Sequence, residues 1–441
     1  MSRLNPVTEH REFFGVPGAL GIATFLPIVL VFFYSVCNEH YSLKGVSLDL
    51  NKVAEQIPYS WNQWLDLVFD LTVWKAYLAW FFTLAVLDVY SPGKDMDGVT
   101  LRDGTKLQYR INGVFMSGTL IVLLLGRLFA SPDWFLPELQ FLYDNQLKLI
   151  FITIIYSFIV SFVVYFMSFI PLRKENGLGT KERILSINGN SGNPIYDWFI
   201  GRELNPRIGA WDIKLFCELR PGMLLLLLIN LSCIHNQYHK FGKISNSIVL
   251  INFLQAFYIF DGVLNEEGCL TMMDIATDGF GFMLAFGDLA WLPWSYSLQC
   301  RYLSLEGNDV DLTWWQALSI LALSFFGYYI FHSANQQKSD FKQGKLESMN
   351  SISTPTGSKL LVDGWWKLSQ HINYFGDWLI GWSWCLPTGT QSVLTYFYVI
   401  YFATLLVHRQ TRDEAKCRAK YGKAWEEYEK QVPYKIIPYI W

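Results

Sequence analysis

The chain has 441 residues, of which 52% are hydrophobic and only 17% charged, with a net charge of −3. Soluble proteins of this size carry about 25% charged residues, and the excess of apolar residues here comes in blocks, which is typical of an integral membrane protein. Such a weak net charge favours no nucleic-acid partner.

Ten apolar windows are long enough to cross about 30 Å of hydrocarbon, which predicts an all-α membrane protein with about ten transmembrane helices. Pro387, Thr388 and Gly389 separate the last two windows and predict a tight hairpin, although those two windows could also form one broken segment. The windows lie near 18–36, 73–92, 111–130, 148–170, 213–235, 247–264, 276–299, 314–332, 374–388 and 391–408.

The distribution of Lys and Arg predicts the orientation of these windows. If the N-terminus is cytoplasmic and the windows alternate in direction, the cytoplasmic segments hold 25 basic residues and the opposite segments hold 5. This asymmetry follows the positive-inside rule and predicts an even number of spans with both termini in the cytoplasm. We expect a short cytoplasmic arm over 1–17 and a single membrane domain over 18–441.

Cysteine and histidine patterns indicate neither a disulfide framework nor a metal site. The seven cysteines are scattered, odd in number and without a C-x-x-C pair. His235 and His239 have metal-ligand spacing but no nearby carboxylate, so we interpret them as loop residues and expect no metal. The first apolar window lacks a cleavage site and is expected to be a retained span rather than a signal peptide.

Six acidic residues lie between Lys243 and Arg301 with no cation among them. Unpaired carboxylates at membrane depth are costly and mark function. Burial favours their protonated form, which can deliver a proton to a weakly basic substrate. Alternatively, some of them cap helices or bond to hydroxyls such as that of Tyr258. The six are Asp261, Glu266, Glu267, Asp274, Asp278 and Asp288.

Asp274 and Asp278 are four residues apart, which predicts that they share one helix face and that one of them holds a proton. The glycines that follow do not make a dinucleotide-binding fingerprint, because "GFGFML" lacks the third glycine and follows no strand. We therefore expect no Rossmann domain.

Polar and aromatic residues follow the eighth window. Lys338 and Lys342 are one helical turn apart and form a two-cation face that suits phosphate groups, or else anchors the helix at the cytoplasmic boundary. The next stretch, 360–378, combines rings with amide, imidazole and carboxylate groups. It suits a flat heteroaromatic ligand, or else forms an interfacial aromatic belt. Its side chains are Trp365, Trp366, His371, Asn373, Tyr374 and Asp377.

The last window runs into a charged stretch at the cytoplasmic boundary. Arg409 and Asp413 are at i and i+4, with the cation first, which is the weaker order for an ion pair on a helix surface. Stability therefore explains this pair poorly. Arg412 and Asp413 together could grip a ligand that carries phosphate and hydroxyl groups.

Three long motifs carry a resemblance to a known family. "GNPIYDWFIGRELNPR" (192–207) and "LLVHRQTRDEAKCRAKYG" (405–422) resemble the two signatures of the sterol reductase family, and the similarity extends over about 13–441. The stretch 261–299 resembles the branch that reduces the C14–C15 double bond, and the C-terminal tail is most similar to fungal members. Gly279, Phe282 and Met283 stand where the Δ7 branch has other residues, and Thr277 is given no catalytic role.

The resemblance implies an endoplasmic reticulum membrane protein with NADPH as hydride donor. It implies a sterol entering from the bilayer, protonated at C15 and reduced at C14. Membrane lipids and other enzymes of the sterol pathway are the further partners it implies. The segment 18–235 would supply helices and a cytoplasmic loop, and 236–441 would hold the sterol pocket and a cytoplasm-facing NADPH pocket.

The resemblance also assigns site residues. Lysine at 342, where the family often has arginine, keeps the charge but loses bidentate geometry. The implied NADPH-binding residues are Lys338, Lys342, Leu361, Trp366, Asn373, Arg409, Asp413 and Tyr428. The implied proton donors are Tyr258 and Glu266, beside the acids Asp261, Asp274 and Asp278.

Several alternative functions remain open at this stage. The chain could reduce another sterol double bond, at Δ7 or C24. A nuclear-envelope anchoring relative would need a chromatin-binding module before the first span, and an isoprenylcysteine methyltransferase-like enzyme would have no use for the acid-rich segment 261–288. A transporter would show inverted-repeat symmetry, which the sequence lacks.

Overall fold

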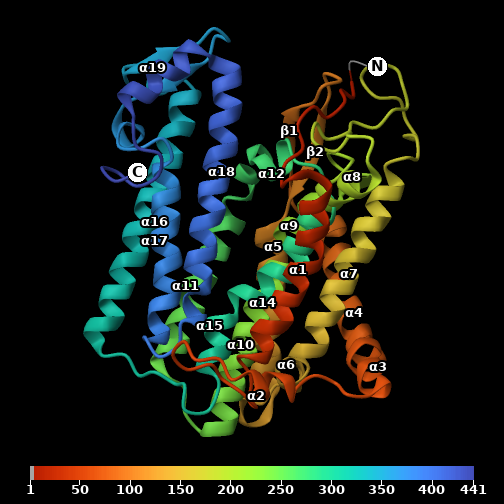
Figure 1. Ribbon diagram of the computed structural model, residues 1–441, viewed down its shortest axis with the longest axis vertical. Coiled ribbons are helices and arrows are strands. Elements are labelled where there is room, and N and C mark those ends of the chain that lie inside the picture. The colour runs from red at the N-terminus through yellow and green to blue at the C-terminus, as the bar shows by residue number, and fades with distance from the viewer. Residues whose placement is uncertain (1–3) are drawn as a thin grey trace. The chain divides into compact units, whose positions relative to one another are not determined.

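The structure is a computed structural model that describes residues 4–441, and its regular structure is almost entirely helical (Figure 1). The chain forms two compact units and passes between them more than once. Unit 1 comprises Met1–Ser42, Leu48–Ile244 and Gln255–Asn308. Unit 2 comprises Leu43–Ser47, Ser245–Leu254 and Asp309–Trp441.

Long apolar helices form the frame of unit 1, and shorter helices join and cover them. The long helices are α1 (Gly15–Ser35), α4 (Leu71–Tyr90), α5 (Gly113–Ala130), α7 (Gln146–Met167) and α10 (Pro221–Phe241). The shorter elements are α2 (Leu50–Ala54), α3 (Trp61–Phe69), α6 (Pro137–Asp144), α8 (Pro194–Ile200), α9 (Ile213–Leu219), η1 (Pro132–Trp134) and η2 (Glu266–Thr271).

Aromatic rings form part of the core of unit 1. The ring of Phe158 lies 4.4 Å from that of Phe282, centroid to centroid, and stacks on Trp198 at 5.9 Å. Trp198 and Phe282 are both buried. These rings join α7, α8 and the helical run after the acid-rich segment, so they position that segment against the N-terminal half of the unit.

Short antiparallel hairpins interrupt the helices in polar stretches for which the sequence predicted no element. In unit 1, β1 (Lys94–Thr100) pairs with β2 (Lys106–Ile111), and β3 (Arg207–Ile208) pairs with β4 (Trp211–Asp212). In unit 2, β5 (Ser351–Ser353) pairs with β6 (Lys359–Leu361). The first hairpin has a register shift between Asp97 and Thr100.

The window predicted over 276–299 is not one continuous α-helix. The short helix α12 (Met273–Ala276) ends where the window starts. A break follows it, and then a helical run that contains a π-helical turn. A Cβ on Gly279 would lie 1.9 Å from the carbonyl oxygen of Gly201, so the break lies directly on the end of α8. The run consists of α13 (Phe282–Phe286), η3 (Gly287–Trp291), α14 (Leu292–Tyr296) and α15 (Leu298–Leu303).

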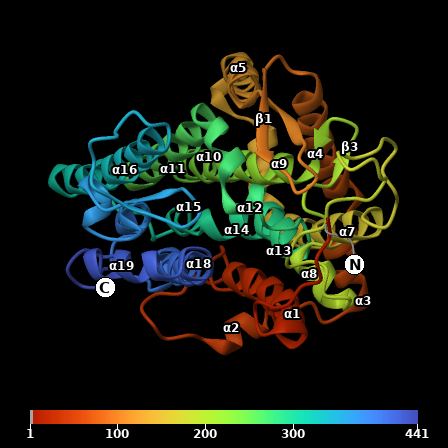
Figure 2. The ribbon, with the colours of Figure 1, turned by 90° about the horizontal axis from the view of Figure 1, so that it is seen from above.

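Unit 2 is built on α16 (Trp314–Lys342), α17 (Ile372–Cys385) and α18 (Phe397–Tyr421). Gly327 and Gly376 let the first two helices approach closely, because a Cβ on either glycine would lie within 2.7 Å of the carbonyl oxygen of the other. The terminal helix α19 (Lys423–Gln431) packs beside the end of α18 (Figure 2). The single-turn helices are η4 (Gly364–Lys367), η5 (Leu386–Thr388) and η6 (Leu394–Tyr396).

The break predicted at Pro387, Thr388 and Gly389 separates two helices. Gly389 has φ +68°, and α18 begins at Phe397 rather than at 391. The last helix also continues well beyond 408, because its second half is a polar helix rather than a membrane window. The ninth and tenth windows are therefore two helices, α17 and α18.

Seven helices within residues 4–441 are long and apolar enough to cross a membrane. One of these is α11 (Asn246–Leu264), whose residues are divided between the two units. Three of the predicted windows lie outside this set. The window 276–299 corresponds to a broken run, 374–388 to a helix of 14 residues, and 391–408 to a helix with a polar second half. The helical, multi-pass membrane protein is confirmed, and the count of ten stays a prediction.

Candidate functional site

In unit 2, a cation on α16 lies over an indole ring. The Nζ of Lys338 is 3.9 Å from the centroid of the Trp366 ring. A desolvated ammonium in this position is attracted to the ring by about 2 kcal/mol. The indole is buried, and its Nε1 donates a 2.9 Å hydrogen bond to the carbonyl oxygen of Ala334. Trp366 therefore fixes the position of the Lys338 charge.

The turn that carries Trp366 is tied to α16 through Gly364 and Gln337. Gly364 has φ +56°, a conformation that favours glycine, and a Cβ there would lie 2.3 Å from Nε2 of Gln337. The Oε1 of Gln337 accepts a 2.9 Å hydrogen bond from the backbone N–H of Trp365. The sequence "DGWWK" thus folds into a turn whose second indole points at α16.

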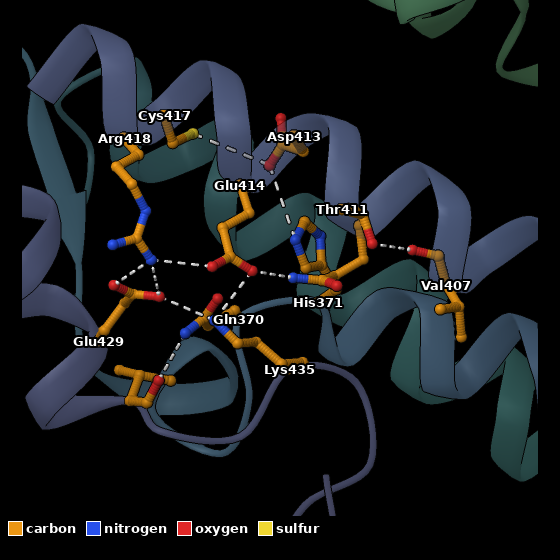
Figure 3. A network of polar contacts seen from close by, with 12 residues as sticks. Gln370, His371, Val407, Thr411, Asp413, Glu414, Cys417, Arg418, Glu429 and Lys435 are labelled. Atoms are coloured by element: carbon orange, nitrogen blue, oxygen red, sulfur yellow. Dashed lines mark hydrogen bonds and ion pairs between the residues drawn. The ribbon is translucent and has the colours of Figure 1, made fainter. Parts of the chain in front are cut away.

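Asp413 on α18 faces a buried histidine (Figure 3). Its Oδ2 is 3.6 Å from Nε2 of His371, which is longer than a hydrogen bond. Burial, together with the charges of Lys338 and Lys435, lowers the pKa of His371 to about 3. The imidazole is therefore neutral at pH 7, and it lies beside the carboxylate without neutralising it.

An ion network joins α18, α19 and the C-terminal segment (Figure 3). The Nζ of Lys435 lies 3.0 Å from Glu414 and 2.8 Å from Glu429. Arg418 bridges the same two carboxylates, at 3.0 Å and 2.9 Å. Burial opposes the ionisation of Glu414, but hydrogen bonds, first among them that from Lys435, outweigh it and lower the pKa of Glu414 to about 2.

Backbone hydrogen bonds hold the C-terminal segment against the start of α17. The N–H groups of Gln370 and His371 donate to the carbonyl oxygens of Tyr434 and Lys435, each at 2.9 Å. The side-chain Nε2 of Gln370 donates to the carbonyl oxygen of Val432, also at 2.9 Å. The segment that carries His371 is thus held in place by the end of the chain.

Tyr428 and Cys417 have Asp413 as a charged neighbour. The Sγ of Cys417 is 3.9 Å from Oδ2 of Asp413. Tyr428 is buried and stacks on Trp425 with ring centroids 4.9 Å apart. Burial, reinforced by Cys417 and Asp413, raises the pKa of Tyr428, so its hydroxyl stays protonated at pH 7 and can donate a hydrogen bond.

Asn373 is the predicted cofactor residue with an unused acceptor. Its Nδ2 donates a 3.1 Å hydrogen bond to Oδ1 of Asn335 on α16. Its own Oδ1 is buried and has no hydrogen-bond partner in the part of the chain that the structure describes. A buried amide oxygen without a donor is costly, so this atom marks a place where a ligand group is expected.

Three further predicted cofactor residues differ in exposure. Leu361 is buried in an apolar cluster with Trp366, so it supports the indole from the core side. Lys342 is exposed in the last turn of α16, and Arg409 is half-buried on α18, one turn before Asp413. A polar surface pocket of about 530 Å³, between β5 and α19, is lined by none of the predicted cofactor residues.

These contacts connect five elements of unit 2. Lys338 interacts electrostatically with Asp413, and Asp413 with Tyr428, so α16, η4, α18 and α19 contribute to one polar region, to which Asn373 adds α17. A cation, a flat ring, a carboxylate, an amide and a hydroxyl suit a ligand with phosphate, heteroaromatic and ribose groups. The residues present therefore fit a nicotinamide dinucleotide.

In unit 1, the acids are not without cations, and this corrects the expectation of unpaired carboxylates. Glu266 is buried and forms an ion pair with the equally buried Arg220, while its second oxygen accepts a 2.8 Å hydrogen bond from the N–H of Gly113. Glu267 is exposed and pairs with Lys94 at 3.0 Å. Both cations lie outside the stretch between 243 and 301, which is why counting charges along the sequence missed them.

Arg220 connects three parts of unit 1. Its Nε lies 3.2 Å from Oδ1 of Asp88 on α4, and its Nη2 donates a 3.1 Å hydrogen bond to Asn112 at the start of α5. Together with the N–H of Gly113, this guanidinium holds the Glu266 carboxyl group beside the starts of α5 and α10.

Lys214 is fully buried in α9 and holds the segment after α12. Its Nζ donates hydrogen bonds to the carbonyl oxygens of Ile275 and Asp278, at 2.7 Å and 2.8 Å. Its charge also interacts with the carboxylates of Asp274 and Asp278. This lysine, which lies at the start of the fifth apolar window, had no role in the sequence prediction.

The helix face predicted for Asp274 and Asp278 does not exist. The helix α12 ends at Ala276, and Thr277 has φ −132°, so Asp278 lies beyond the helix. The close approach of Gly279 to the end of α8 pulls the backbone out of helical geometry. The two acids are connected through Lys214 instead.

Asp261 and Tyr258 lie in the last turns of α11, three residues apart. The carboxylate of Asp261 accepts a 3.0 Å hydrogen bond from Nδ2 of Asn265, and both Tyr258 and Asp261 are half-buried. Their position at the start of the acid-rich segment agrees with the sequence analysis.

Two further acids of unit 1 were not among the predicted catalytic residues. Asp288, in η3, is buried, and Glu218, in α9, is half-buried. Lys214, Glu218 and Arg220 all lie within or beside the apolar window 213–235. Charged residues inside a window of membrane hydrophobicity are the signal that could have identified this cluster.

Comparisons with known proteins agree with the motifs. The family model described as "Ergosterol biosynthesis ERG4/ERG24 family" matches residues 7–441. The chain is 67% identical to Delta(14)-sterol reductase ERG24 of Candida albicans, covering 100% of this chain and 99% of the relative. It is 58% identical to Delta(14)-sterol reductase ERG24 of Saccharomyces cerevisiae, covering 100% of both chains.

A more distant relative is longer than this chain. The chain is 40% identical to Delta(14)-sterol reductase LBR of Gallus gallus, over 98% of this chain and 64% of the relative. Because the family model extends over almost the entire sequence and the two fungal relatives match it end to end, the resemblance to sterol reductases is confirmed. The chain belongs to the ERG4/ERG24 family of ergosterol biosynthesis.

Proposed function

We propose that this protein reduces the C14–C15 double bond of 8,14-diene sterols in ergosterol-type sterol biosynthesis. The observation that carries the proposal is the 67% identity, over the whole chain, to a relative named Delta(14)-sterol reductase. Gly279, Phe282 and Met283 support the same branch, since the Δ7 branch is expected to differ at these positions. A Δ7 or C24 reductase is the alternative within the same family.

We propose NADPH as the reductant, which supplies a hydride to C14 when bound in unit 2. Lys338 and Lys342 would hold phosphate groups, with Lys338 fixed by its contact with Trp366. Asn373 has a buried amide oxygen available for a donor. Asp413 and the protonated hydroxyl of Tyr428 would bind hydroxyl groups.

The neutral state of His371 contributes to this site. A protonated imidazole 3.6 Å from Asp413 would neutralise the carboxylate and weaken its attraction for hydroxyl donors of a ligand. Burial keeps the ring neutral, so His371 does not neutralise Asp413. Arg409, one turn earlier on α18, would add a cation on the same helix.

The proton for C15 would come from the acid-rich part of unit 1. Tyr258 and Glu266 are the proposed donors, beside the acids Asp261, Asp274 and Asp278, and the ion pair with Arg220 fixes the position of Glu266. Protonation at C15 leaves a cation at C14 that is delocalised over the diene, and neighbouring carboxylates stabilise this charge. The substrate is apolar and flat, so we propose that it enters from the bilayer.

The proposed location follows from the chemistry and from the charge count. A sterol substrate partitions into lipid, and seven helices within the described residues are long and apolar enough to place the protein in a membrane. We propose the endoplasmic reticulum membrane, with both termini in the cytoplasm and the NADPH site facing it. Membrane lipids and other enzymes of the sterol pathway are the proposed partners.

The test is an assay of the purified full-length protein with NADPH and an 8,14-diene sterol, in parallel with a Δ7 sterol and a C24 alkene. We expect mass spectrometry to show a gain of two hydrogens in the 8,14-diene only, with matching oxidation of NADPH. Reduction of another sterol alone would overturn the branch assignment. A failure to oxidise NADPH with every sterol would overturn the reductase proposal and favour a methyltransferase-like or anchoring relative.

A further inference from the structure

Helix α3 of unit 1 leads into the apolar helix α4, and its surface is divided into three faces. One face packs against the protein: Leu67 is buried, and the ring of Trp64 lies 6.1 Å from that of Phe151 on α7, centroid to centroid. A second face is exposed and polar, and it carries Asn62 and Asp66. The packed face and the polar face leave a third arc of the helix between them.

The third face of α3 is exposed and apolar. Trp61 is 74% exposed, Leu65 37% and Phe69 60%. Because they are four residues apart along the chain, these side chains form one stripe along the helix. With 3.6 residues per turn, the stripe lies between the face that packs on the protein and the face that is polar. This separation of exposed apolar and polar faces is typical of a helix that lies in the plane of a membrane interface.

Polar contacts hold α3 in this orientation. The Nζ of Lys148 on α7 lies 2.9 Å from Asp66 and 2.8 Å from Asp70. The carboxylate of Asp70 also accepts hydrogen bonds from the backbone N–H groups of Thr72 and Val73, at 2.9 Å and 3.3 Å. Since the packed face and the polar face are both held, the apolar stripe stays on the outside of the unit.

The length of α4 places α3 at the edge of the hydrocarbon. The stretch Trp61–Tyr90 has 30 residues, which as one helix would be about 45 Å long, against about 30 Å of hydrocarbon. The 20 residues of α4 alone are about 30 Å long. Asp70 has ψ 105° and breaks the helix, and Nε1 of Trp74 donates a 2.8 Å hydrogen bond across the break to the carbonyl oxygen of Val68. Helix α4 is therefore long enough to span the bilayer without α3.

We propose that α3 is an interfacial helix that binds the lipid–water boundary of the bilayer. Trp61, Leu65 and Phe69 enter the upper part of the acyl chains, and the polar face stays among the headgroups. The partner is the apolar part of the bilayer rather than an anionic headgroup, because the sequence of α3, WNQWLDLVF, contains an acid and no cation. Leu71, the first residue of α4, is also exposed, so apolar surface is present on both sides of the break. The inference rests on the multi-pass membrane fold and not on the proposed reaction.

Spin labels on the full-length protein in phosphatidylcholine vesicles test the depth of the stripe. We expect labels in Leu65→Cys and Phe69→Cys to be more accessible to oxygen, which concentrates in lipid, than to a water-soluble nickel complex. Asn62→Cys and Gln63→Cys are matched controls on the polar face of the same helix, and their labels should show the opposite preference. The wild type, labelled in the same way, gives the background from its own cysteines.

Three results of the labelling would overturn the inference. A preference for the nickel complex at all four positions would place the stripe in water, and a preference for oxygen at all four would place α3 inside the hydrocarbon. Exclusion of both reagents from positions 65 and 69 would mean that a protein surface covers the stripe. Addition of phosphatidylglycerol should leave the accessibilities unchanged, and insertion that requires this anionic lipid would contradict an apolar contact.

Quenching of tryptophan fluorescence tests the same depth without a label, should a cysteine variant fold poorly. The difference between the wild type and Trp61→Phe isolates the emission of Trp61. We expect brominated phosphatidylcholine to quench this emission more strongly when the bromines are near the headgroup end of the acyl chain than when they are near its methyl end. No quenching by either lipid, or stronger quenching by the deep bromines, would overturn the proposed position of α3.

Discussion

The ion networks of the two units lie at different depths. In unit 1 the network around Arg220 is buried: the Arg220 side chain is 4% exposed and that of Glu266 is 1% exposed. In unit 2 the ion network around Lys435 is more accessible: Arg418 is 53% exposed and Lys435 is 22% exposed. Buried charges cost several kcal/mol when a partner is removed, whereas exposed pairs contribute about 1 kcal/mol or less. The Arg220 network therefore stabilises the interior of unit 1, whereas the Lys435 network orders an accessible edge of unit 2.

Removal of the buried cation should have the largest effect. Arg220→Met leaves Glu266 and Asp88 without their cation, and we expect a loss of about 3–5 kcal/mol in the free energy of unfolding. Thermal unfolding of the solubilised protein, followed by tryptophan fluorescence, measures this. Lys94→Met, which removes the exposed partner of Glu267, is the control and should cost less than about 1 kcal/mol. Equal losses in both variants would refute the contrast between buried and exposed ion pairs.

Acidification should reveal the buried histidine of unit 2. The pKa of His371 falls from 6.5 to about 3 on folding, so the unfolded chain binds a proton that the folded chain does not. Stability is complete above pH 6.5 and decreases as the pH falls, by up to about 1.4 kcal/mol per pH unit. Melting curves at pH 7.5, 6.5, 5.5 and 4.5 should show a shallower loss for His371→Gln. His10→Gln, at an exposed position of unit 1, should follow the wild type.

The polar region of unit 2 should determine cofactor affinity. We expect Asp413→Ala and Arg409→Ala each to raise KM for NADPH about tenfold, since a hydrogen bond to a charged group contributes about 1.5–3 kcal/mol. The matched control is Lys416→Ala, which removes an exposed cation from the same helix. If KM is unchanged in both variants, the cofactor role of these residues is wrong.

The smallest effect should come from the ion network at the end of the chain. Lys435→Met removes two ion pairs, and we expect a loss of about 1 kcal/mol or less. Hydrogen exchange should detect it as faster exchange of the backbone N–H groups of Gln370 and His371, which bond to 434 and 435. Lys430→Met, at an exposed position of α19, should leave these rates unchanged.

Much of unit 2 could be predicted from local sequence. Lys338 contacts Trp366, and His371 faces Asp413, so the three polar stretches that the sequence singled out do lie together. Lys338 and Asp413 lie on α16 and α18, the same helices as the apolar windows that precede them, so the length of each helix fixes where its polar residues lie. The contribution of the C-terminal segment was not predicted, because its hydrogen bonds to 370 and 371 depend on the backbone and not on residue type.

The site in unit 1 was harder to predict, because its pairs are distant in sequence. Arg220 reaches Asp88 and Glu266, and Lys214 reaches the carbonyl oxygen of Asp278. A count of charges along the chain cannot find such partners. The period-four rule for Asp274 and Asp278 failed for a related reason, since contact with α8 ends the helix between them.

The contact between Gly279 and Gly201 has a consequence for chimeric enzymes. Gly201 has φ +97°, and the Cβ of any other residue at 279 would collide with its carbonyl oxygen. The two stretches recognised as separate motifs, 192–207 and 261–299, are thus two sides of one backbone contact. Suppose that 261–299 is replaced by the segment of a relative that has a side chain at 279. The segment 192–207 should then be replaced by that of the same relative. The two segments would then transfer double-bond specificity only when they are exchanged together. In a library that varies one segment alone, most variants would fold poorly.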